Sequence, residues 1–191
     1  MPHTKQSIFN NTKLVLKNYK HIIDSSEYWK LDTPPTEHKI VIDSQNSGYI
    51  FQWPSKVPLD TVGGYKLKDG KGYICLSETY IQSSSSKLSK VAHVYRYIDS
   101  DAVYHMSSSS DVEGVIKNYG FHLDEDLTYD NGHLKDKDRH PETHLQVMHS
   151  HPRFATQENL LLDFLKMVER TCFDDSGESY SQPVYAINTV R

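Results

Sequence analysis

The sequence predicts an α+β fold, in which an antiparallel β-meander of about five or six strands is packed against an N-terminal and a C-terminal amphipathic helix. Apolar residues recur at helical spacing over 7–24 and again over 156–173. Between these segments, β-branched and aromatic residues alternate with polar ones in short runs that turn sequences separate. These observations together predict a sheet with a helix at each end of the chain.

The length of 191 residues suits a single α+β domain that spans 1–191. We expect an N-terminal helix within 1–30, the meander over 39–151 and a C-terminal helix over 156–173. In the first helix Ser7 is the expected N-cap, and the apolar stripe consists of Ile8, Val15, Tyr19, Ile22 and Ile23.

The strands of the meander are predicted from alternation and turn chemistry. Segments 39–44 and 48–53 are β-branched and aromatic, and an Asp-Gly turn within 65–82 predicts a hairpin. The serine-rich stretch 83–89 is expected to be a polar turn, and 91–99 is a further strand.

The second half of the meander is more polar. A capping-box pattern predicts the short helix 111–119, and 121–140 is expected to be a loop around one short strand. Residues 144–148 alternate again. Thr156 is the expected N-cap of the C-terminal helix, whose apolar stripe consists of Leu161, Phe164, Leu165, Val168 and Cys172.

Composition excludes several classes of protein. No segment approaches about 18 uninterrupted apolar residues, so no membrane span is expected. The first residues lack the apolar run of a secretory signal, and Cys75 and Cys172 are too few for a disulfide-stapled scaffold. Both are expected to be core thiols, and a cytoplasmic protein is predicted.

Charge is distributed unevenly along the chain. Residues 1–98 carry 13 Lys and Arg against 8 Asp and Glu, a net of +5, whereas residues 99–191 carry 8 against 17, a net of -9. The basic half favours an anionic partner such as nucleic acid, and the acidic half favours a basic protein.

Histidines are concentrated in one third of the chain. Of the 11 histidines, eight lie between His93 and His151. His140 and His144 flank the sequence PET, and Arg153 follows nearby. Two imidazoles and a guanidinium suffice for metal-free phosphodiester cleavage, since they accept a proton, donate a proton and stabilise charge on phosphorus. We therefore predict His140, His144 and Arg153 as catalytic residues.

Other interpretations of the histidines remain open. A metal such as Zn or Mn is a second possibility, with His149, His151, Asp124 and Asp126 as ligands, although the spacing matches no established metal motif. A third is a pH-sensing or partner-binding surface. No cofactor is required for the first interpretation.

Aromatic and basic residues near the histidines are candidates for contact with nucleic acid. They are Tyr95, Arg96, Tyr97 and Tyr104. Nucleotide-binding loops and the GxSxG nucleophile motif are absent from the sequence.

The order of segments over about residues 65–173 resembles an uncharacterised bacterial family, the domain of unknown function 2290. The hairpin YICLSETYIQ with VAHVYRYID leads through HPETHL and an Arg-containing segment to a helix with an FL pair. The matching positions are His140, Pro141, His144, Leu145, Arg153, Phe164 and Leu165. A looser resemblance to the TumE toxins of bacterial toxin–antitoxin pairs implies a growth-inhibiting, nuclease-type toxin.

The leading prediction is a toxin or phage-defence protein that cleaves nucleic acid, RNA rather than DNA, and pairs with a cognate antitoxin or effector protein. The alternative is a non-catalytic binding module that pairs with a larger effector protein through its edge strands or its acidic half. A small metal-dependent hydrolase is the third hypothesis.

Overall fold

The computed structural model of the protein describes residues 3–41, 47–54, 64–100, 120–126, 143–147, 153–155 and 160–173. It has an α+β fold with an antiparallel sheet, which confirms the predicted fold class. The described elements are α1 (Lys5–Asn18), the 3₁₀ helix η1 (Ser25–Asp32), β1 (Thr36–Val41), β2 (Ser47–Trp53), β3 (Tyr65–Lys66), the 3₁₀ helix η2 (Lys68–Gly70), β4 (Tyr73–Ser84), β5 (Lys87–Ile98), β6 (Gly120–Asp126), β7 (Thr143–Val147), β8 (Arg153–Ala155) and α4 (Leu161–Phe173).

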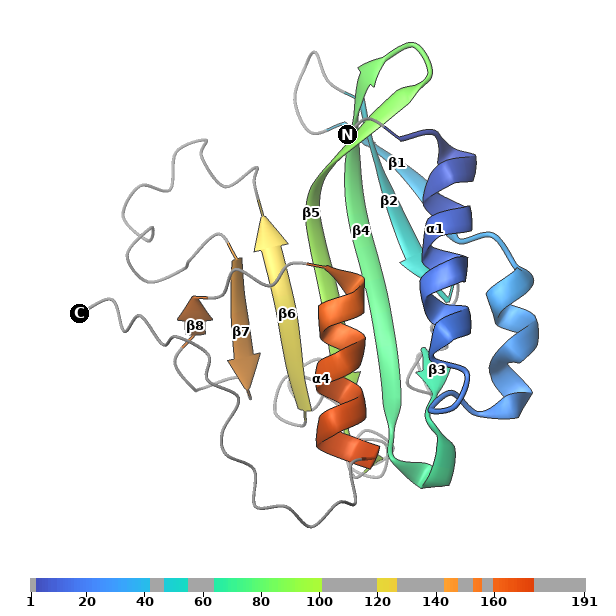
Figure 1. The fold of residues 1–191 in the computed structure, drawn as a ribbon. Helices are drawn as coiled ribbons and strands as arrows, with labels where there is room; N and C mark the ends of the chain where they lie inside the picture. The colour runs from blue at the N-terminus through green and yellow to red at the C-terminus, as the bar shows by residue number, and fades with distance from the viewer. Residues whose placement is uncertain are drawn as a thin grey trace, which may run out of the picture.

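The sheet has eight described strands, against the five or six expected. Their order is β1-β2-β4-β5-β6-β7-β8, and every neighbouring pair is antiparallel. The two-residue strand β3 pairs with β4 beyond the end of β2, with Tyr65 opposite Ile74. Figure 1 shows that the long strands β4 and β5 form the middle of this sheet.

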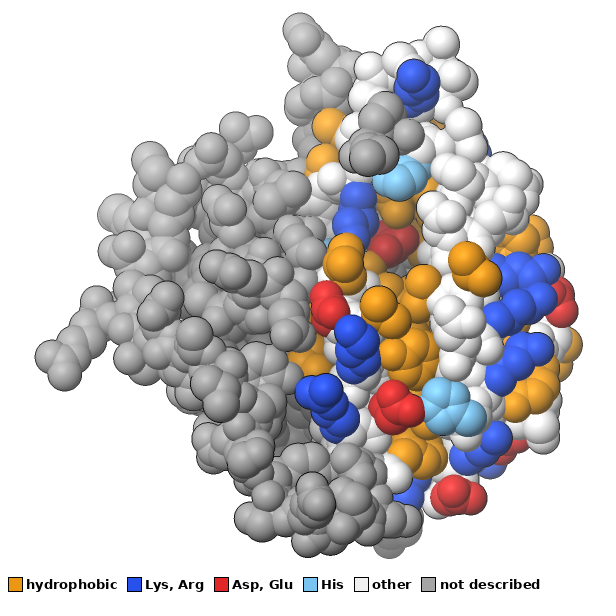
Figure 2. Space-filling view, in the orientation of Figure 1, with side chains coloured by type: hydrophobic (Ala, Val, Ile, Leu, Met, Phe, Trp, Pro, Cys, Tyr) orange, Lys and Arg blue, Asp and Glu red, His pale blue; other side chains and the backbone are white. Residues whose placement is uncertain are grey.

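Both α-helices cover the same face of the sheet (Figure 1). Adjacent strands place Trp53, Leu76, Tyr95 and Leu123 opposite one another, and all four are buried on this face. Phe164 of α4 is fully buried and lies against Tyr95, with 5.7 Å between the ring centroids. Figure 2 shows hydrophobic side chains between the two helices and charged side chains on the surfaces around them.

Helix α1 begins three residues earlier than predicted. Thr4 is the N-cap, and its hydroxyl accepts a hydrogen bond from the backbone N–H of Ser7 at 3.1 Å. The Ser7 hydroxyl accepts in return from the Thr4 N–H at 2.9 Å, which completes a capping box. The prediction of Ser7 as N-cap was therefore wrong, because the serine occupies the N3 position of the same motif.

The helical segment expected within 1–30 consists of two helices. The α-helix ends at Asn18, and Asp24 begins η1 by accepting a hydrogen bond from the Ser26 N–H at 2.9 Å. Ile22 and Ile23 lie between the two helices and are buried, so they contribute to the core from a turn.

The serine-rich stretch 83–89 is mostly strand, in contrast to the predicted turn. Strand β4 runs to Ser84 and β5 starts at Lys87, with Ser84 opposite Lys87. Leu88 is buried and also exchanges two backbone hydrogen bonds of 2.6 Å with His3. Pairing with the N-terminal segment extends the hairpin through residues whose composition alone favours a turn.

The C-terminal helix agrees with its predicted apolar stripe. All five stripe residues are buried: Leu161, Phe164, Leu165, Val168 and Cys172. The expected N-cap Thr156 and the expected helix 111–119 lie outside the described residues. Within the described part of the chain, the helices are too short and too polar to span a bilayer.

Candidate functional site

Strand register brings several predicted site residues into two rows of the sheet. Residues directly opposite one another belong to the same face, and alternate residues of a strand belong to opposite faces. One row consists of Ser77, Val94, Asp124, His144 and Ala155. The other row consists of Cys75, Arg96, His122, Gln146 and Arg153.

These two rows belong to the face opposite the helices. The row between them contains Leu76, Tyr95 and Leu123, which are buried on the helix-covered face. Since faces alternate along a strand, the rows of His144 and of Arg153 share the other face. We use the name open-face set for the positions Arg96, His122, Asp124, His144 and Arg153, which belong to the face that α1 and α4 do not cover.

The open-face set combines groups that suit acid–base chemistry on a phosphate. Asp124 is the direct cross-strand partner of His144, and His122 is one position removed from that pair along the same face. Direct partners have Cβ atoms about 5 Å apart and diagonal neighbours about 7–8 Å apart. The backbone pairing of β5 to β8 therefore places two histidines, two arginines and one aspartate at positions of two adjacent rows.

His122 is a candidate that the sequence analysis missed. The sequence predicts a loop around one short strand over 121–140, whereas β6 pairs with β5 over 120–126 and with β7 over 121–125. The spacing of His122 and Asp124, two residues apart within the alternating sequence FHLDED, is the feature that indicates a shared strand face.

The other predicted site residues are distributed as follows. His140, Tyr104, His149 and His151 lie outside the described residues, and Asp126 lies on β6 opposite Ala92. The described residues contain no group of three or more His, Cys, Asp and Glu side chains arranged to hold a metal ion. The metal site therefore stays a prediction.

Tyr95 and Tyr97 are core residues. Tyr95 is 1% exposed and its ring lies 4.3 Å from the ring of His93. Tyr97 is buried, and its hydroxyl donates to the backbone carbonyl of Lys71 at 2.8 Å. Their burial on the helix-covered face corrects the expectation that they stack on bases, whereas Arg96 between them belongs to the open face.

A second group of titratable side chains lies under the helices, on β4 and β5. Glu78 accepts hydrogen bonds from the hydroxyl of Tyr80 at 2.9 Å and from that of Tyr95 at 2.5 Å. The ammonium of Lys90 lies 3.9 Å from the same carboxylate, whose side chain is 8% exposed. His93 is the direct cross-strand partner of Glu78 and is buried. We call these five residues the Glu78 cluster.

Burial shifts the pKa of two residues of the Glu78 cluster, Tyr80 and His93. It raises the pKa of Tyr80, an effect to which the charge of Glu78 adds, so this hydroxyl remains a donor. Burial, with a smaller contribution from Lys90, lowers the pKa of His93 to about 3. The hydroxyls of Tyr80 and Tyr95 bond to the Glu78 carboxylate, and neutral His93 lies opposite it, so the cluster joins β4 to β5 and is structural.

Burial of neutral His93 is expected to make the protein less stable in mild acid. The unfolded chain takes up a proton near the ordinary pKa of 6.5, whereas the folded chain does so only near pH 3. The free energy of unfolding should therefore fall as the pH drops below about 6.5, by up to about 1.4 kcal/mol per pH unit from this residue. Urea denaturation of the wild type and His93→Phe at pH 7, 6 and 5 measures the difference in slope.

His38→Ala is the control for that slope, because His38 is exposed on β1. This variant should retain the wild-type dependence on pH. Equal slopes for the wild type and His93→Phe would contradict the assignment of the acid sensitivity to His93.

Comparison with known proteins adds no relative: no family model, curated protein or solved structure matches the chain. The resemblance noted over residues 65–173 accordingly stays a prediction.

Proposed function

We propose that this protein cleaves phosphodiester bonds of nucleic acid, RNA in preference to DNA, by histidine acid–base chemistry on the open face of its sheet. The supporting observation is the register of β5 to β8, in which His144 and Arg153 occupy adjacent rows of one face. The biological setting that goes with this activity, a bacterial toxin or phage-defence protein, is proposed from the sequence resemblance.

The proposed reaction needs two imidazoles with different roles. His144 accepts the proton of the ribose 2′-hydroxyl, and the 2′-oxygen then forms a bond to phosphorus. The bond from phosphorus to the 5′-oxygen breaks as a second, protonated imidazole gives its proton to that oxygen. The products are a 2′,3′-cyclic phosphate and a free 5′-hydroxyl.

His122 and His140 are the two candidates for the second imidazole. Register favours His122, since it occupies the same face as His144 on the neighbouring strand. The guanidiniums of Arg153 and Arg96 are proposed to stabilise the charge that develops on the non-bridging phosphate oxygens. Arg96 and Arg153 belong to one row, with His122 and Gln146 between them.

The substrate follows from the same chemistry. DNA lacks the 2′-hydroxyl that serves as nucleophile, so metal-free cleavage is restricted to RNA. We expect the purified protein to cleave single-stranded RNA in EDTA and to leave single-stranded DNA of the same sequence intact. The measurement is product length on a denaturing gel, with detection of the cyclic phosphate.

The same cleavage assay in the presence of manganese distinguishes the metal-free mechanism from a metal-dependent one. Cleavage of both polymers that requires manganese would contradict the metal-free mechanism and favour ligands such as Asp124, His149 and His151. Absence of cleavage under both conditions, from a protein that is folded by circular dichroism, would contradict the nuclease proposal.

The alternative function, a binding module for a larger effector or a cognate antitoxin, is favoured by the edge strand β1. Among the described strands β1 pairs only with β2, and Val41 at its end is 72% exposed. An extended segment of a partner can add to such an edge by backbone hydrogen bonds. A stable stoichiometric complex with a partner, without cleavage, would support this module.

A further inference from the structure

A small pocket lies where η1 and the chain after it meet the ends of β2 and β3. It has a volume of about 150 Å³. Most of its lining is aromatic or proline, and the lining residues are Trp29, Lys30, Thr33, Pro34, Pro35, Trp53, Pro54 and Tyr65. The pocket is far in sequence from the open-face set, and the site of proposed cleavage does not include it.

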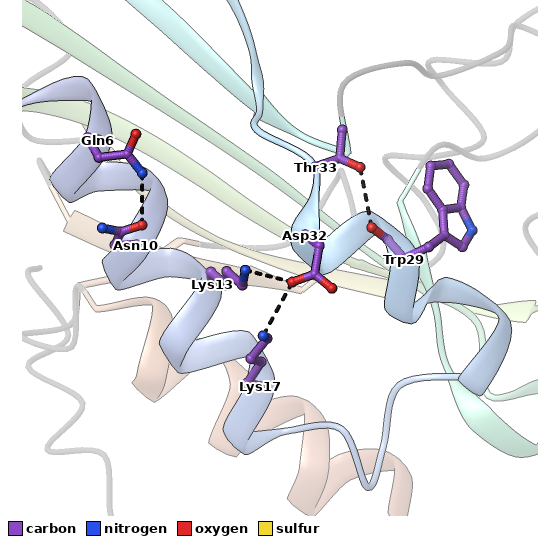
Figure 3. Close-up of polar contacts among 7 residues, drawn as sticks. All are labelled: Gln6, Asn10, Lys13, Lys17, Trp29, Asp32 and Thr33. Atoms are coloured by element: carbon purple, nitrogen blue, oxygen red, sulfur yellow. Dashed lines mark hydrogen bonds and ion pairs between the residues drawn. The ribbon is translucent and has the colours of Figure 1, made fainter.

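The aromatic residues of the pocket differ in their exposure to solvent. Trp29 is 64% exposed, whereas Trp53 is 3% and Tyr65 is 0% exposed. Figure 3 shows that the Trp29 indole points away from the ion-paired group formed by Lys13, Lys17 and Asp32. An exposed indole beside a concave apolar surface is typical of a recognition site, since the ring offers a large rigid contact area.

The size of the pocket limits what it can hold. A cavity of about 150 Å³ accommodates a single ring of about the size of benzene. A pocket of this volume therefore fits one side chain of a larger molecule.

Two of the polar side chains that line the pocket, Lys30 and Thr33, have partners within the protein. Lys30 forms an ion pair with Glu27, and the Thr33 hydroxyl donates to the Trp29 carbonyl at 3.3 Å. Nearby, Lys13 and Lys17 lie 2.6 Å and 3.3 Å from a carboxylate oxygen of Asp32. The lysines at this surface are thus compensated by carboxylates, which disfavours a phosphate backbone because its binding depends on available cations.

We propose that this pocket binds a proline ring of an extended, proline-containing segment of a partner protein. Grooves lined by aromatic residues recognise such segments because the polyproline II helix is preformed and loses little entropy on binding. The ring is neutral, fits the volume and needs no hydrogen bond from the wall. This binding function goes beyond the proposed cleavage and does not depend on it.

Tryptophan fluorescence reports on this site directly, because the chain has only two tryptophans and both line the pocket. Titration with a hexaproline peptide should change the emission of the full-length protein in a saturable way. A hexa-alanine peptide at the same concentrations should not. Isothermal titration calorimetry then gives the affinity without relying on the chromophore.

Two variants test whether the proline peptide contacts Trp29. Trp29→Ala should weaken binding of the proline peptide by about tenfold or more, as expected for an aromatic anchor. Leu14→Ala is the matched control, since Leu14 is similarly exposed, at 63%, on α1 and does not line the pocket. It should leave the affinity within about twofold of wild type.

Three outcomes would overturn the proposal. Equal affinity of Trp29→Ala and the wild type would place the binding elsewhere, and no saturable response to hexaproline would exclude this ligand class. A saturable response to oligouridylate without one to hexaproline would assign the pocket to nucleic acid. The His144→Ala protein should bind hexaproline normally, which separates this test from that of the cleavage activity.

Discussion

Replacing His144 by alanine is expected to lower the rate of RNA cleavage by a factor of about 10²–10⁴, the range for loss of a general acid or base. His144 is expected to act as that group because register places it opposite Asp124 and beside the row of Arg153. The measurement is the single-turnover rate on a fluorescent RNA in EDTA.

A matched control separates loss of chemistry from loss of fold. His38→Ala makes the same substitution on another strand, at the opposite end of the described sheet, and should keep the wild-type rate. Circular dichroism and the urea midpoint should be unchanged in both variants. An unchanged rate in a folded His144→Ala protein would contradict the assignment.

His122→Ala and His140→Ala then identify the second imidazole. If His122 is the proton donor, its replacement should lower the rate as strongly as that of His144 and remove the alkaline limb of the dependence on pH, because a proton donor is inactive once it is deprotonated. The double variant His122→Ala/His144→Ala should then be little slower than either single one, because the two residues act as a unit. A normal cleavage rate for His122→Ala together with a slow rate for His140→Ala would identify His140 as the proton donor.

Replacing Glu78 by alanine is expected to reduce the free energy of unfolding by about 3 kcal/mol or more. Glu78 accepts from two tyrosine hydroxyls and lies 3.9 Å from the Lys90 ammonium, in a cluster covered by the helices. Hydrogen bonds to a charged group contribute about 1.5–3 kcal/mol each, and the alanine variant removes the shared acceptor of both hydroxyls. Urea denaturation at pH 7 measures the loss.

Two variants test that explanation. Glu37→Ala removes an exposed carboxylate whose ion pair with Lys5 spans 2.9 Å, and it should cost about 1 kcal/mol or less. Glu78→Gln keeps one acceptor oxygen and loses the charge, so its stability should lie between those of the wild type and Glu78→Ala. A Glu78→Ala protein as stable as Glu37→Ala would show that the cluster does not hold β4 to β5.

Much of the secondary structure can be predicted because its causes are local. The five apolar positions of α4 recur at helical spacing, and all of them are buried. The alternation of β4 and β5 likewise follows from period-two patterning within each segment. The N-cap of α1 was misassigned because Thr4 and Ser7 both fit the motif, and local sequence alone does not decide which residue begins the helix.

Alternation along a strand does not tell which of its two faces packs into the core. Tyr95 and Arg96 alternate in the same strand, and the sequence does not say which of the two faces the helices. The structure buries Tyr95 against Phe164 and also buries Tyr97, so these two candidates for nucleic-acid contact are core residues, whereas Arg96 belongs to the opposite face. Glu78 went unnoticed for the same reason, since it looks like a surface residue until the burial of its face is known.

The fold class and the C-terminal helix follow from composition and periodicity, which are properties of neighbouring residues, and the concentration of histidines is visible in the sequence. Which distant residues share a row depends on strand pairing, and pairing is a property of the tertiary structure. His122, His144 and Arg153 come from three strands, and the chain segments between those strands do not specify register. A shift of one residue would move an entire strand's side chains to the other face, so the open-face set depends on backbone pairing that spacing along the chain cannot encode.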